Sequence, residues 1–412
     1  MDSFLLYQYV ITGVLTIIFA NFLVNNFLFK DISRFTIPDS LKSSLPLISI
    51  LIPARNEAKN IGKCIKSLLK QSYPNIEILV LNDNSTDNTA VVVNKIAEKN
   101  SKVRLINGAP LPHGWLGKSY ACYQLSKHAK GEYLIFTDAD TFHFRDSISN
   151  AISCLIRNNL DALSAYPLQI MVSIHERILV SFINFFILGF LPLALVKNSR
   201  SPFFCTAIGQ FMMFKKDVYQ KIGGHKSVRN KVLEDVHISK QVKRHGYKFM
   251  IFDARKNIYC RMYKNFEDLI YGFSRFIFAA FNYNATVQFT ITILFSAVFL
   301  FPFILLPLGL FVFDWSPLIT NLITIQIFII LLIRLMLSIR FKGKVFDALL
   351  HPLSMLYIIV ISINSVLQSK LKHGIYWKGR IYDASDGKNL KLLDSDYPDE
   401  TEDVTFGEIK SS

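Results

Sequence analysis

The chain has 412 residues, of which 51% are hydrophobic and only 19% are charged, and its mean hydropathy is +0.31. Soluble globular domains carry about 25% charged residues, so this composition excludes a fully soluble protein, a disordered chain and a disulfide scaffold. The 46 basic residues exceed the 31 acidic residues by 15. Many basic residues flank apolar segments, which favours a membrane surface over a nucleic acid as their partner.

The N-terminal apolar run spans residues 5–29 without a charge, which is long enough to cross a bilayer of about 30 Å. A signal peptide would have a basic start and a shorter apolar segment, whereas here Asp2 precedes the run and Lys30 follows it. The positive-inside rule then predicts a transmembrane helix over residues 1–30 and a cytoplasmic domain over residues 31–285.

Residues 47–252 alternate between short strands and amphipathic helices. Strands are predicted at residues 47–53, 76–81, 103–106 and 133–137, with helices at 61–69 and 91–99. Continuous apolar strands separated by helices predict a parallel sheet that is covered on both faces. Ligands bind outside the carboxyl ends of such strands, so the polar residues at strand ends are the candidate site residues.

Residues 178–196 are apolar but lie between two halves of the candidate site. A membrane crossing there would put the two halves on opposite sides of the bilayer. We therefore expect an interfacial or re-entrant helix at the membrane surface.

The carboxyl third predicts transmembrane segments within residues 286–370. The apolar runs are residues 286–313, 318–333 and 349–367. Four full crossings from an outside N-terminus would leave the C-terminus outside, whereas basic residues such as Lys378 and Arg380 favour the inside. We therefore expect one apolar segment to form a hairpin or to lie in the interface. Residues 371–412 form a basic and then acidic tail, predicted to be disordered from residue 394 onward.

Two polar motifs follow the first two predicted strands, residues 53–57 (PARNE) and 82–87 (NDNSTD). Each motif alone is typical of turns and helix caps. Both nevertheless fall at the carboxyl ends of adjacent strands, where one ligand can touch both.

Asp138 and Asp140 follow the fourth predicted strand. In an extended segment, residues i and i+2 point to the same side, so the two carboxylates can share one hard cation. Mg²⁺ or Mn²⁺ takes one or two carboxylates and completes its shell with phosphate oxygens and water. The alternative is a turn acid followed by a helix cap, but two adjacent acids repel each other without a cation.

Glu234 and Asp235 open a predicted helix over residues 236–246. Such a pair can simply complement the helix dipole, or Asp235 can be a general base close to a metal-bound phosphate.

Residues 114–118 (GWLGK) form a glycine-rich turn that leads into a helix. That turn can cradle phosphate with the help of Lys118, although its spacing is not that of a Walker A loop; the alternative is a loop around a buried Trp.

Taken in order, these motifs resemble family 2 glycosyltransferases over about residues 47–280. Residues 114–118, the flanking membrane segments and the WKGR sequence at residues 377–380 are similar to the membrane-bound branch that includes carotenoid-type and hopanoid-associated glycosyltransferases. The resemblance implies an α/β fold of the GT-A nucleotide-diphosphosugar transferase type (Rossmann-like) joined to transmembrane helices.

The resemblance also implies roles for individual residues. Those expected to bind the nucleotide sugar are Pro53, Ala54, Glu57, Asp83, Lys118 and Asp138. Asp83 would accept a hydrogen bond from the nucleobase imide. Asp138 and Asp140 would hold the divalent cation, Mg²⁺ or Mn²⁺, across the diphosphate. Asp235 would be the catalytic base of an inverting single displacement.

The QxxRW motif of processive polysaccharide synthases is absent, and Arg261 and Arg275 stand in its region. Each arginine can contact the diphosphate or anchor the chain at the membrane surface. The absence of the motif favours transfer of a single sugar, from a UDP-sugar by family analogy, to a lipid hydroxyl or carboxyl such as that of a carotenoid or another isoprenoid. The sequence thus predicts a multi-pass protein of the inner (plasma) membrane; a processive polysaccharide synthase with a translocation channel is the alternative.

Overall fold

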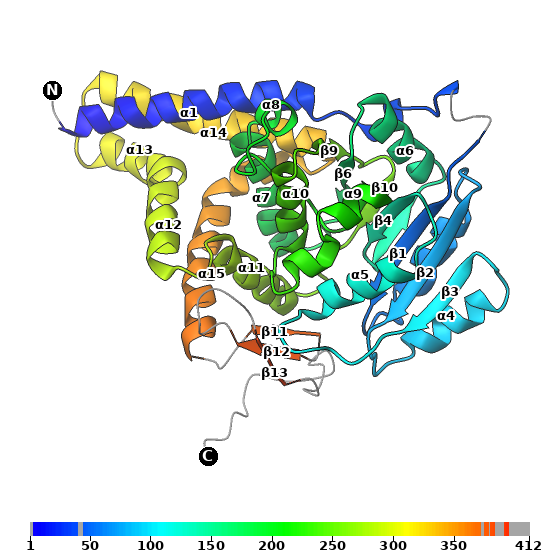
Figure 1. The fold of residues 1–412 in the computed structure, drawn as a ribbon. Helices are drawn as coiled ribbons and strands as arrows, with labels where there is room; N and C mark the ends of the chain where they lie inside the picture. The colour runs from blue at the N-terminus through cyan, green and yellow to red at the C-terminus, as the bar shows by residue number, and fades with distance from the viewer. Residues whose placement is uncertain (1–2, 40–43, 372–374, 379, 384–390, 395–412) are drawn as a thin grey trace, which may run out of the picture.

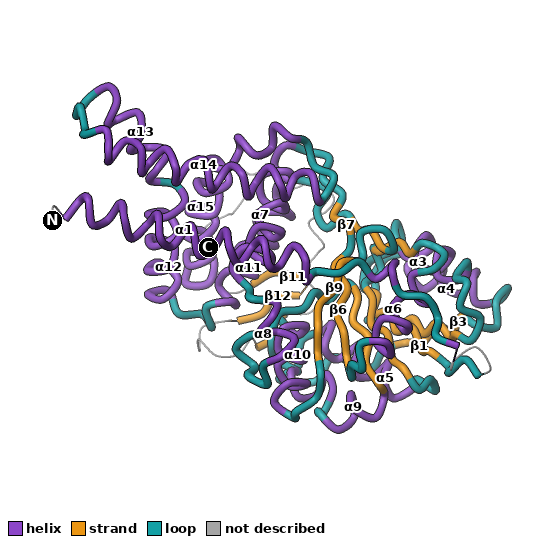
Figure 2. Tube along the Cα trace, turned by 90° about the horizontal axis from the view of Figure 1, so that it is seen from above, coloured by secondary structure: helices purple, strands orange, loops and turns teal. Residues whose placement is uncertain are grey.

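The computed structural model describes residues 3–39, 44–371, 375–378, 380–383 and 391–394. Two parts lie side by side in Figure 1, a sheet domain on the right and a group of long apolar helices on the left. The view from above in Figure 2 shows the same division, with α1 and α13 extending away from the strands.

A seven-stranded sheet in the order β3-β2-β1-β4-β8-β6-β9 forms the core of the sheet domain. Its strands are β1 (Ile48–Ala54), β2 (Ile76–Asn82), β3 (Val103–Asn107), β4 (Tyr133–Thr137), β6 (Ala162–Tyr166), β8 (Phe211–Lys215) and β9 (Phe249–Asp253). The four predicted strands pair in parallel, as expected. Strand β8 runs antiparallel to both of its neighbours, so the complete sheet is mixed.

Helices cover both faces of this sheet. They are α3 (Ile61–Leu69), α4 (Thr89–Ala97), α5 (Gly117–His128), α6 (Ser147–Arg157), α9 (Lys216–Lys221) and α10 (Glu234–Arg244). Ile50 and Leu51 of β1 point to opposite faces and are both fully buried, which is the signature of a strand covered on both sides. A smaller sheet lies beside the main one, formed by β5 (Thr141–His143), β10 (Ile258–Cys260) and β7 (Leu168–Gln169).

The apolar segments form helices that are bounded much as predicted. They are α1 (Ser3–Leu28), α12 (Ala285–Phe299), α13 (Phe301–Phe311), α14 (Pro317–Arg340) and α15 (His351–Leu371), which follows the short η3 (Val345–Leu350). Within the described residues, three helical segments are long and apolar enough to cross a membrane, namely Ser3–Leu28, Pro317–Arg340 and Val345–Leu367. Helices α12 and α13 meet at a 46° bend and count as a fourth only when taken together.

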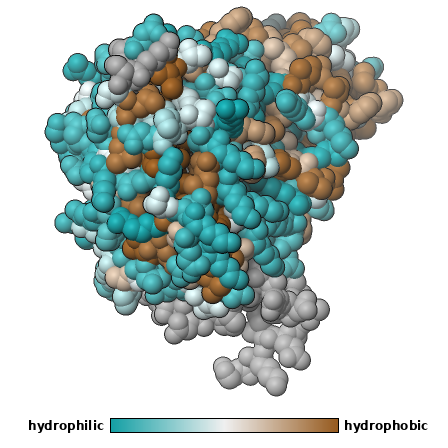
Figure 3. Space-filling view, turned by 90° about the vertical axis from the view of Figure 1, so that its right-hand side faces the viewer, coloured by the Kyte–Doolittle hydropathy of each residue, from teal (hydrophilic) through white to brown (hydrophobic). Residues whose placement is uncertain are grey.

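The apolar segment at residues 178–196 forms most of α7 (Ile174–Phe190) and α8 (Leu193–Asn198). Helix α7 packs against α1, α14 and α15, and it is not among the segments that meet the length and hydropathy criteria for a crossing. It therefore joins the sheet domain to the apolar helices. Figure 3 looks onto the sheet-domain end, which is mainly hydrophilic, with apolar side chains gathered toward one upper edge.

Buried polar side chains fasten α1 to its neighbours. The Asn25 side chain donates to the carbonyls of Leu188 and Leu191 and accepts from the Leu193 amide, at 2.6–2.9 Å. Near the other end, Gln326 of α14 donates to the Gln8 side chain at 3.0 Å. Polar groups hold apolar helices in register in this way because water is not available as a partner.

Six described elements remain. They are η1 (Ile32–Arg34), η2 (Gly224–Val228), α11 (Phe266–Ala280), β11 (Ile375–Trp377), β12 (Arg380–Asp383) and β13 (Lys391–Asp394). The last three strands form an antiparallel sheet after α15. The acidic tail predicted from residue 394 onward lies outside the described residues, apart from Asp394 itself, which ends β13.

Candidate functional site

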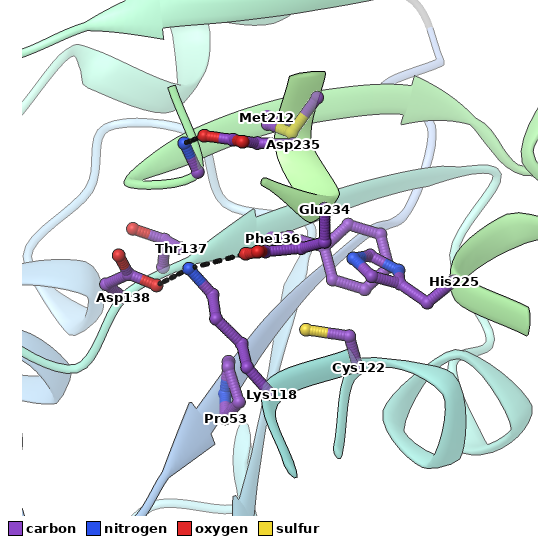
Figure 4. Close-up of a pocket in the computed structure, with 11 residues that line it drawn as sticks. Pro53, Lys118, Cys122, Phe136, Thr137, Asp138, Met212, His225, Glu234 and Asp235 are labelled. Atoms are coloured by element: carbon purple, nitrogen blue, oxygen red, sulfur yellow. Dashed lines mark hydrogen bonds and ion pairs between the residues drawn. The ribbon is translucent and has the colours of Figure 1, made fainter. Parts of the chain in front are cut away.

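Lys118 stands at the centre of a pocket at the edge of the main sheet (Figure 4). Its ammonium lies 2.8 Å from an Asp138 carboxylate oxygen and 3.0 Å from one of Glu234. The lysine is in the first turn of α5, which begins at Gly117 as the glycine-rich motif predicts. Burial alone would lower the pKa of Lys118, but the two carboxylates outweigh it and hold that pKa well above its usual value.

Asp138 and Asp140 lie in a turn between β4 and β5. The expectation of an extended segment is therefore wrong, because the Thr141 hydroxyl and amide turn back to donate to the Asp138 carbonyl, the hydroxyl at 2.7 Å. The two carboxylates still lie close enough to act on each other. Burial, then Asp138 and then Glu57 raise the pKa of Asp140 to about 7.

The turn that carries Asp138 and Asp140, which we call the acid turn, has the donor chemistry of a divalent-cation site. One Asp140 carboxylate oxygen is buried and has no hydrogen-bond partner among the described residues. Those residues contain no group of three or more His, Cys, Asp or Glu side chains that could hold a metal ion. A Mg²⁺ or Mn²⁺ ion that takes one or two carboxylates and completes its shell with phosphate and water needs no such group. Asp138 and Asp140 therefore fit the cation that the motif implies.

Glu234 and Asp235 open α10 and point in different directions (Figure 4). Glu234 faces Lys118, whereas the Asp235 carboxylate accepts from the Gly209 amide at 2.8 Å. Burial and then the neighbouring Glu234 raise the pKa of Asp235 to about 7, although Lys118 opposes the shift. Glu234 is thus, with Asp138, an ion-pair partner of Lys118. Asp235 is a partly exposed carboxylate with a raised pKa.

Gly209 closes this part of the pocket, and the sequence analysis missed it. A Cβ atom at this position would lie 2.9 Å from the Lys118 ammonium and 3.4 Å from an Asp235 oxygen. The glycine precedes β8, whose reversed direction brings its amino end to the carboxyl end of β4. Cys122 and His225 also line the pocket, and burial lowers the pKa of His225 to about 3, which keeps it neutral.

The two polar motifs after β1 and β2 meet as predicted. Ala54 is in register with Asn82, and the Asp83 amide donates to the Ala54 carbonyl at 2.8 Å. Pro53 lines the Lys118 pocket, so this pair of strand ends is continuous with the acid turn. We call the strand ends with Glu57 and Asp83 the nucleotide end of the site, and the pocket around Lys118 and Asp235 the catalytic end.

The C-terminal strands reach the nucleotide end, which the sequence analysis did not foresee. Arg380 donates to both Asp83 carboxylate oxygens, at 2.5 and 2.8 Å, and Lys378 is ion-paired with Glu57. In the sequence, these two basic residues indicated only the orientation of the membrane segments and a family resemblance. Gly379, which stands between them in the WKGR sequence, lies outside the described residues.

The two arginines in the region of the missing QxxRW motif have different partners. Arg261 pairs with Glu176 at 2.7 Å, and Glu176 belongs to the capping box that starts α7. Arg275 lies on α11 with its guanidinium 5.1 Å from the centre of the Phe276 ring. Neither arginine lines the Lys118 pocket, and a contact of either with the diphosphate remains a prediction.

Comparisons with known proteins identify the family of the sheet domain. The mixed α/β sheet has a fold of the GT-A type. Residues 49–223 match glycosyl transferase family 2, which identifies this part of the chain as a family 2 glycosyltransferase domain.

The chain is 29% identical to the 4,4'-diaponeurosporenoate glycosyltransferase of Staphylococcus aureus and 28% identical to that of Staphylococcus haemolyticus. Each match covers 231 residues, which are 55% of this chain and 60% of the relative. Among solved structures, the chain is similar to the mannosyltransferase PcManGT from Pyrobaculum calidifontis in complex with GDP-Man and Mn²⁺, with a TM-score of 0.48 and 18% identity over 88% of this chain and 99% of that chain. It is also similar to S. aureus TarS 1-349 in complex with UDP-GlcNAc, with a TM-score of 0.38 and 17% identity over 87% and 98% of the two chains.

Proposed function

We propose that this glycosyltransferase moves one sugar from a nucleotide-diphosphate sugar to a membrane lipid, with inversion at the sugar carbon that is attacked. The observation that carries the proposal is the meeting of Lys118, the acid turn and Asp235 in one pocket that continues into the nucleotide end. UDP-sugars are the donors that family analogy favours.

At the donor side, the barrier falls when negative charge on the leaving diphosphate is stabilised. Lys118 is held as an ammonium by its raised pKa, so it is ready to bind that charge. Asp138 and Asp140 are the residues that would hold a divalent cation, which when bound supplies further positive charge to the diphosphate. Pro53, Ala54, Glu57 and Asp83 would surround the nucleoside.

At the acceptor side, Asp235 would take the proton from an attacking lipid hydroxyl. A general base works best when its pKa lies near the operating pH, and the pKa of Asp235 is about 7. Direct attack by the acceptor on the side opposite the leaving diphosphate inverts the sugar carbon in one displacement. A carboxyl acceptor would already be ionised at neutral pH and would not need this proton transfer.

A lipid acceptor is supported by the helix between the two halves of the site. Helix α7 leaves the sheet domain after the acid turn and returns before Gly209, and it packs against three apolar helices. Its Phe186 side chain is 52% exposed and is therefore available for contact with a lipid. The names of the two staphylococcal relatives add support for a carotenoid-type acceptor.

A multi-pass protein of the inner (plasma) membrane, with a cytoplasmic sheet domain, is the arrangement that we infer. Lys378 and Arg380 contact the sheet domain, so an even number of crossings must separate α11 from β11. A pair made of the bent α12–α13 unit and α14 satisfies this rule if α15 lies along the membrane surface. Figure 1 draws α15 across the direction of α1 and α14.

The test is to incubate the full-length protein in detergent with Mn²⁺ or Mg²⁺, a panel of UDP- and GDP-sugars, and a total membrane-lipid extract. We expect mass spectrometry to find a lipid that has gained a single sugar. The product should disappear with EDTA, and a product formed on a hydroxyl should also disappear in Asp235→Asn. Asp217→Asn is the matched control, because Asp217 is an exposed acid paired with Lys221 on α9. A ladder of sugar additions would favour the processive synthase, and a hydroxyl-linked product that survives in Asp235→Asn would refute the assigned base.

A further inference from the structure

The C-terminal strands return from the apolar helices to the nucleotide end of the site. Strands β11 and β12 follow α15 and lie below α11 and beside α5 in Figure 1. We call β11, β12 and Lys378 between them the C-terminal hairpin. It brings two basic side chains to carboxylates that lie about three hundred positions earlier in the chain, with sequence separations of 297 and 321 residues.

Arg380 anchors the hairpin. Its guanidinium binds the Asp83 carboxylate through two hydrogen bonds of 2.5 and 2.8 Å, and the two side chains are only 3% and 6% exposed. A Cβ atom at Gly117 would collide with this guanidinium, so the glycine of the Lys118 turn leaves room for it. A paired and forked contact of this kind fixes both position and orientation.

Lys378 differs from Arg380 because it remains open to the site. Its side chain is 34% exposed and is ion-paired with Glu57, and its carbonyl accepts from Arg55 at 2.7 Å. The ammonium also contributes to the lowered pKa of Asp87, after the hydrogen bonds from Thr89 and Ala58, and it opposes the rise in the pKa of Asp140 that burial, Asp138 and Glu57 cause. The positive charge therefore faces the region between the nucleotide loops and the acid turn.

The charges around the site indicate what the Lys378 ammonium can bind. Glu57, Asp138, Asp140, Glu234 and Asp235 are five acids around the space that a nucleotide diphosphate would enter, and Lys118 is ion-paired with two of them. An entering anion would be repelled by the carboxylates unless cations face it. Lys378 adds a second ammonium, which is ion-paired with Glu57 and not with the carboxylates that Lys118 binds.

We propose that the C-terminal hairpin is part of the donor site, with Arg380 as its anchor and Lys378 as a ligand of the nucleotide diphosphate. This inference rests on the proposed function and adds a substrate contact to it. Lys378 would exchange part of its ion pair with Glu57 for phosphate oxygens, which offer several acceptors to a three-donor ammonium.

The experiment measures the affinity of the full-length protein in detergent for UDP, GDP, uridine and guanosine in the presence of Mg²⁺. We expect Lys378→Ala to weaken binding of the preferred diphosphate about tenfold, the range of one charge-assisted hydrogen bond. Binding of the matching nucleoside should stay within about twofold, because it carries no phosphate. Lys378→Arg should restore most of the loss.

Lys215→Ala is the matched control, since Lys215 is 33% exposed and forms a 2.8 Å ion pair with Asp161 away from the site. Tighter diphosphate binding in Lys378→Ala would overturn the inference, because the hairpin would then compete with the donor. Unchanged binding would overturn it as well. If the unmodified protein bound none of the nucleotides, the proposed function itself would fail, so the two failures are distinguishable.

Discussion

The two ends of the site differ in how their acids are neutralised. At the nucleotide end each acid has a cation of its own, since Asp83 is paired with Arg380 and Glu57 with Lys378. At the catalytic end one ammonium, that of Lys118, is shared between two carboxylates. Two further acids at that end have pKa values raised to about 7.

In the proposed function, this difference separates a binding role from a chemical one. Fully paired charges hold a fixed shape, which suits recognition of a nucleotide. A group of acids that is short of positive charge attracts a cation and keeps a carboxylate ready to take a proton near neutral pH. The catalytic end has that second character, and the predictions below are chosen to break or sharpen the contrast.

The largest expected effect is on Asp235. Asp235→Asn cannot accept the acceptor proton, so we expect transfer to a hydroxyl to fall by about 10²–10⁴-fold. Nucleotide affinity should stay within about twofold, because Asp235 belongs to the catalytic end. Transfer rate and nucleotide affinity measured on the same preparation check this, with Asp217→Asn as the control. A parallel loss of both quantities would mean that Asp235 supports the fold of the site.

The next largest expected effect is the dependence of kcat/KM on pH. The folded protein raises the pKa of Asp235 from its ordinary value of 3.8 to about 7, and the base works only when it is deprotonated. We therefore expect kcat/KM to rise with pH up to about 7 and to fall about tenfold per unit below it. An acid limb near pH 4 would show that the environment leaves Asp235 unperturbed during turnover.

Removal of the Lys118 ammonium should shift the acid limb of the pH profile of kcat/KM. Lys118 opposes the rise in the pKa of Asp235, so Lys118→Met should shift the acid limb to higher pH, by on the order of one unit. The pH profile of kcat/KM for the variant measures the shift, and Lys215→Met provides the control. A limb that stays in place, with only a lower maximum, would mean that Lys118 acts on the leaving group alone.

The smallest effect is expected from substitution of Gly209, which lines the catalytic end. A Cβ atom at Gly209 would approach the Lys118 ammonium to 2.9 Å, which requires the flexible lysine tip to shift. We expect Gly209→Ala to lower the transfer rate several-fold while the protein remains folded. Gly13→Ala is the control, because a Cβ atom there meets nothing within 4 Å. An unchanged rate would show that the ammonium position tolerates displacement.

Local patterns in the sequence predicted much of this molecule. The apolar run of β1 and the one-sided helix α3, with Ile61, Ile65 and Leu68 buried, were predictable because strand and helix periodicities are local properties. The polar strand ends met where expected, because parallel neighbours end at the same edge of a sheet. The long apolar helices followed from run length alone.

Other features depend on contacts that no local pattern carries. The reversed strand β8 follows a long segment that leaves the sheet for α7, so nothing nearby reports its direction. The turn at Asp138 depends on hydrogen bonds from Thr141, which the assumption of an extended segment overlooked. The pairing of Arg380 with Asp83 joins residues 297 positions apart, and no local pattern in the basic segment after the last apolar run indicates this partner.

The most direct test of the contrast between the two ends is to count bound Mn²⁺ by electron paramagnetic resonance, with and without UDP or GDP. We expect the unmodified protein to hold about one Mn²⁺ per chain when the preferred nucleotide is present, because two carboxylates and the phosphates complete its shell. Asp140→Asn should lose that ion and Asp235→Asn should keep it. Retention of Mn²⁺ by Asp140→Asn, or equal nucleotide binding in EDTA, would contradict the account of the catalytic end as a cation site.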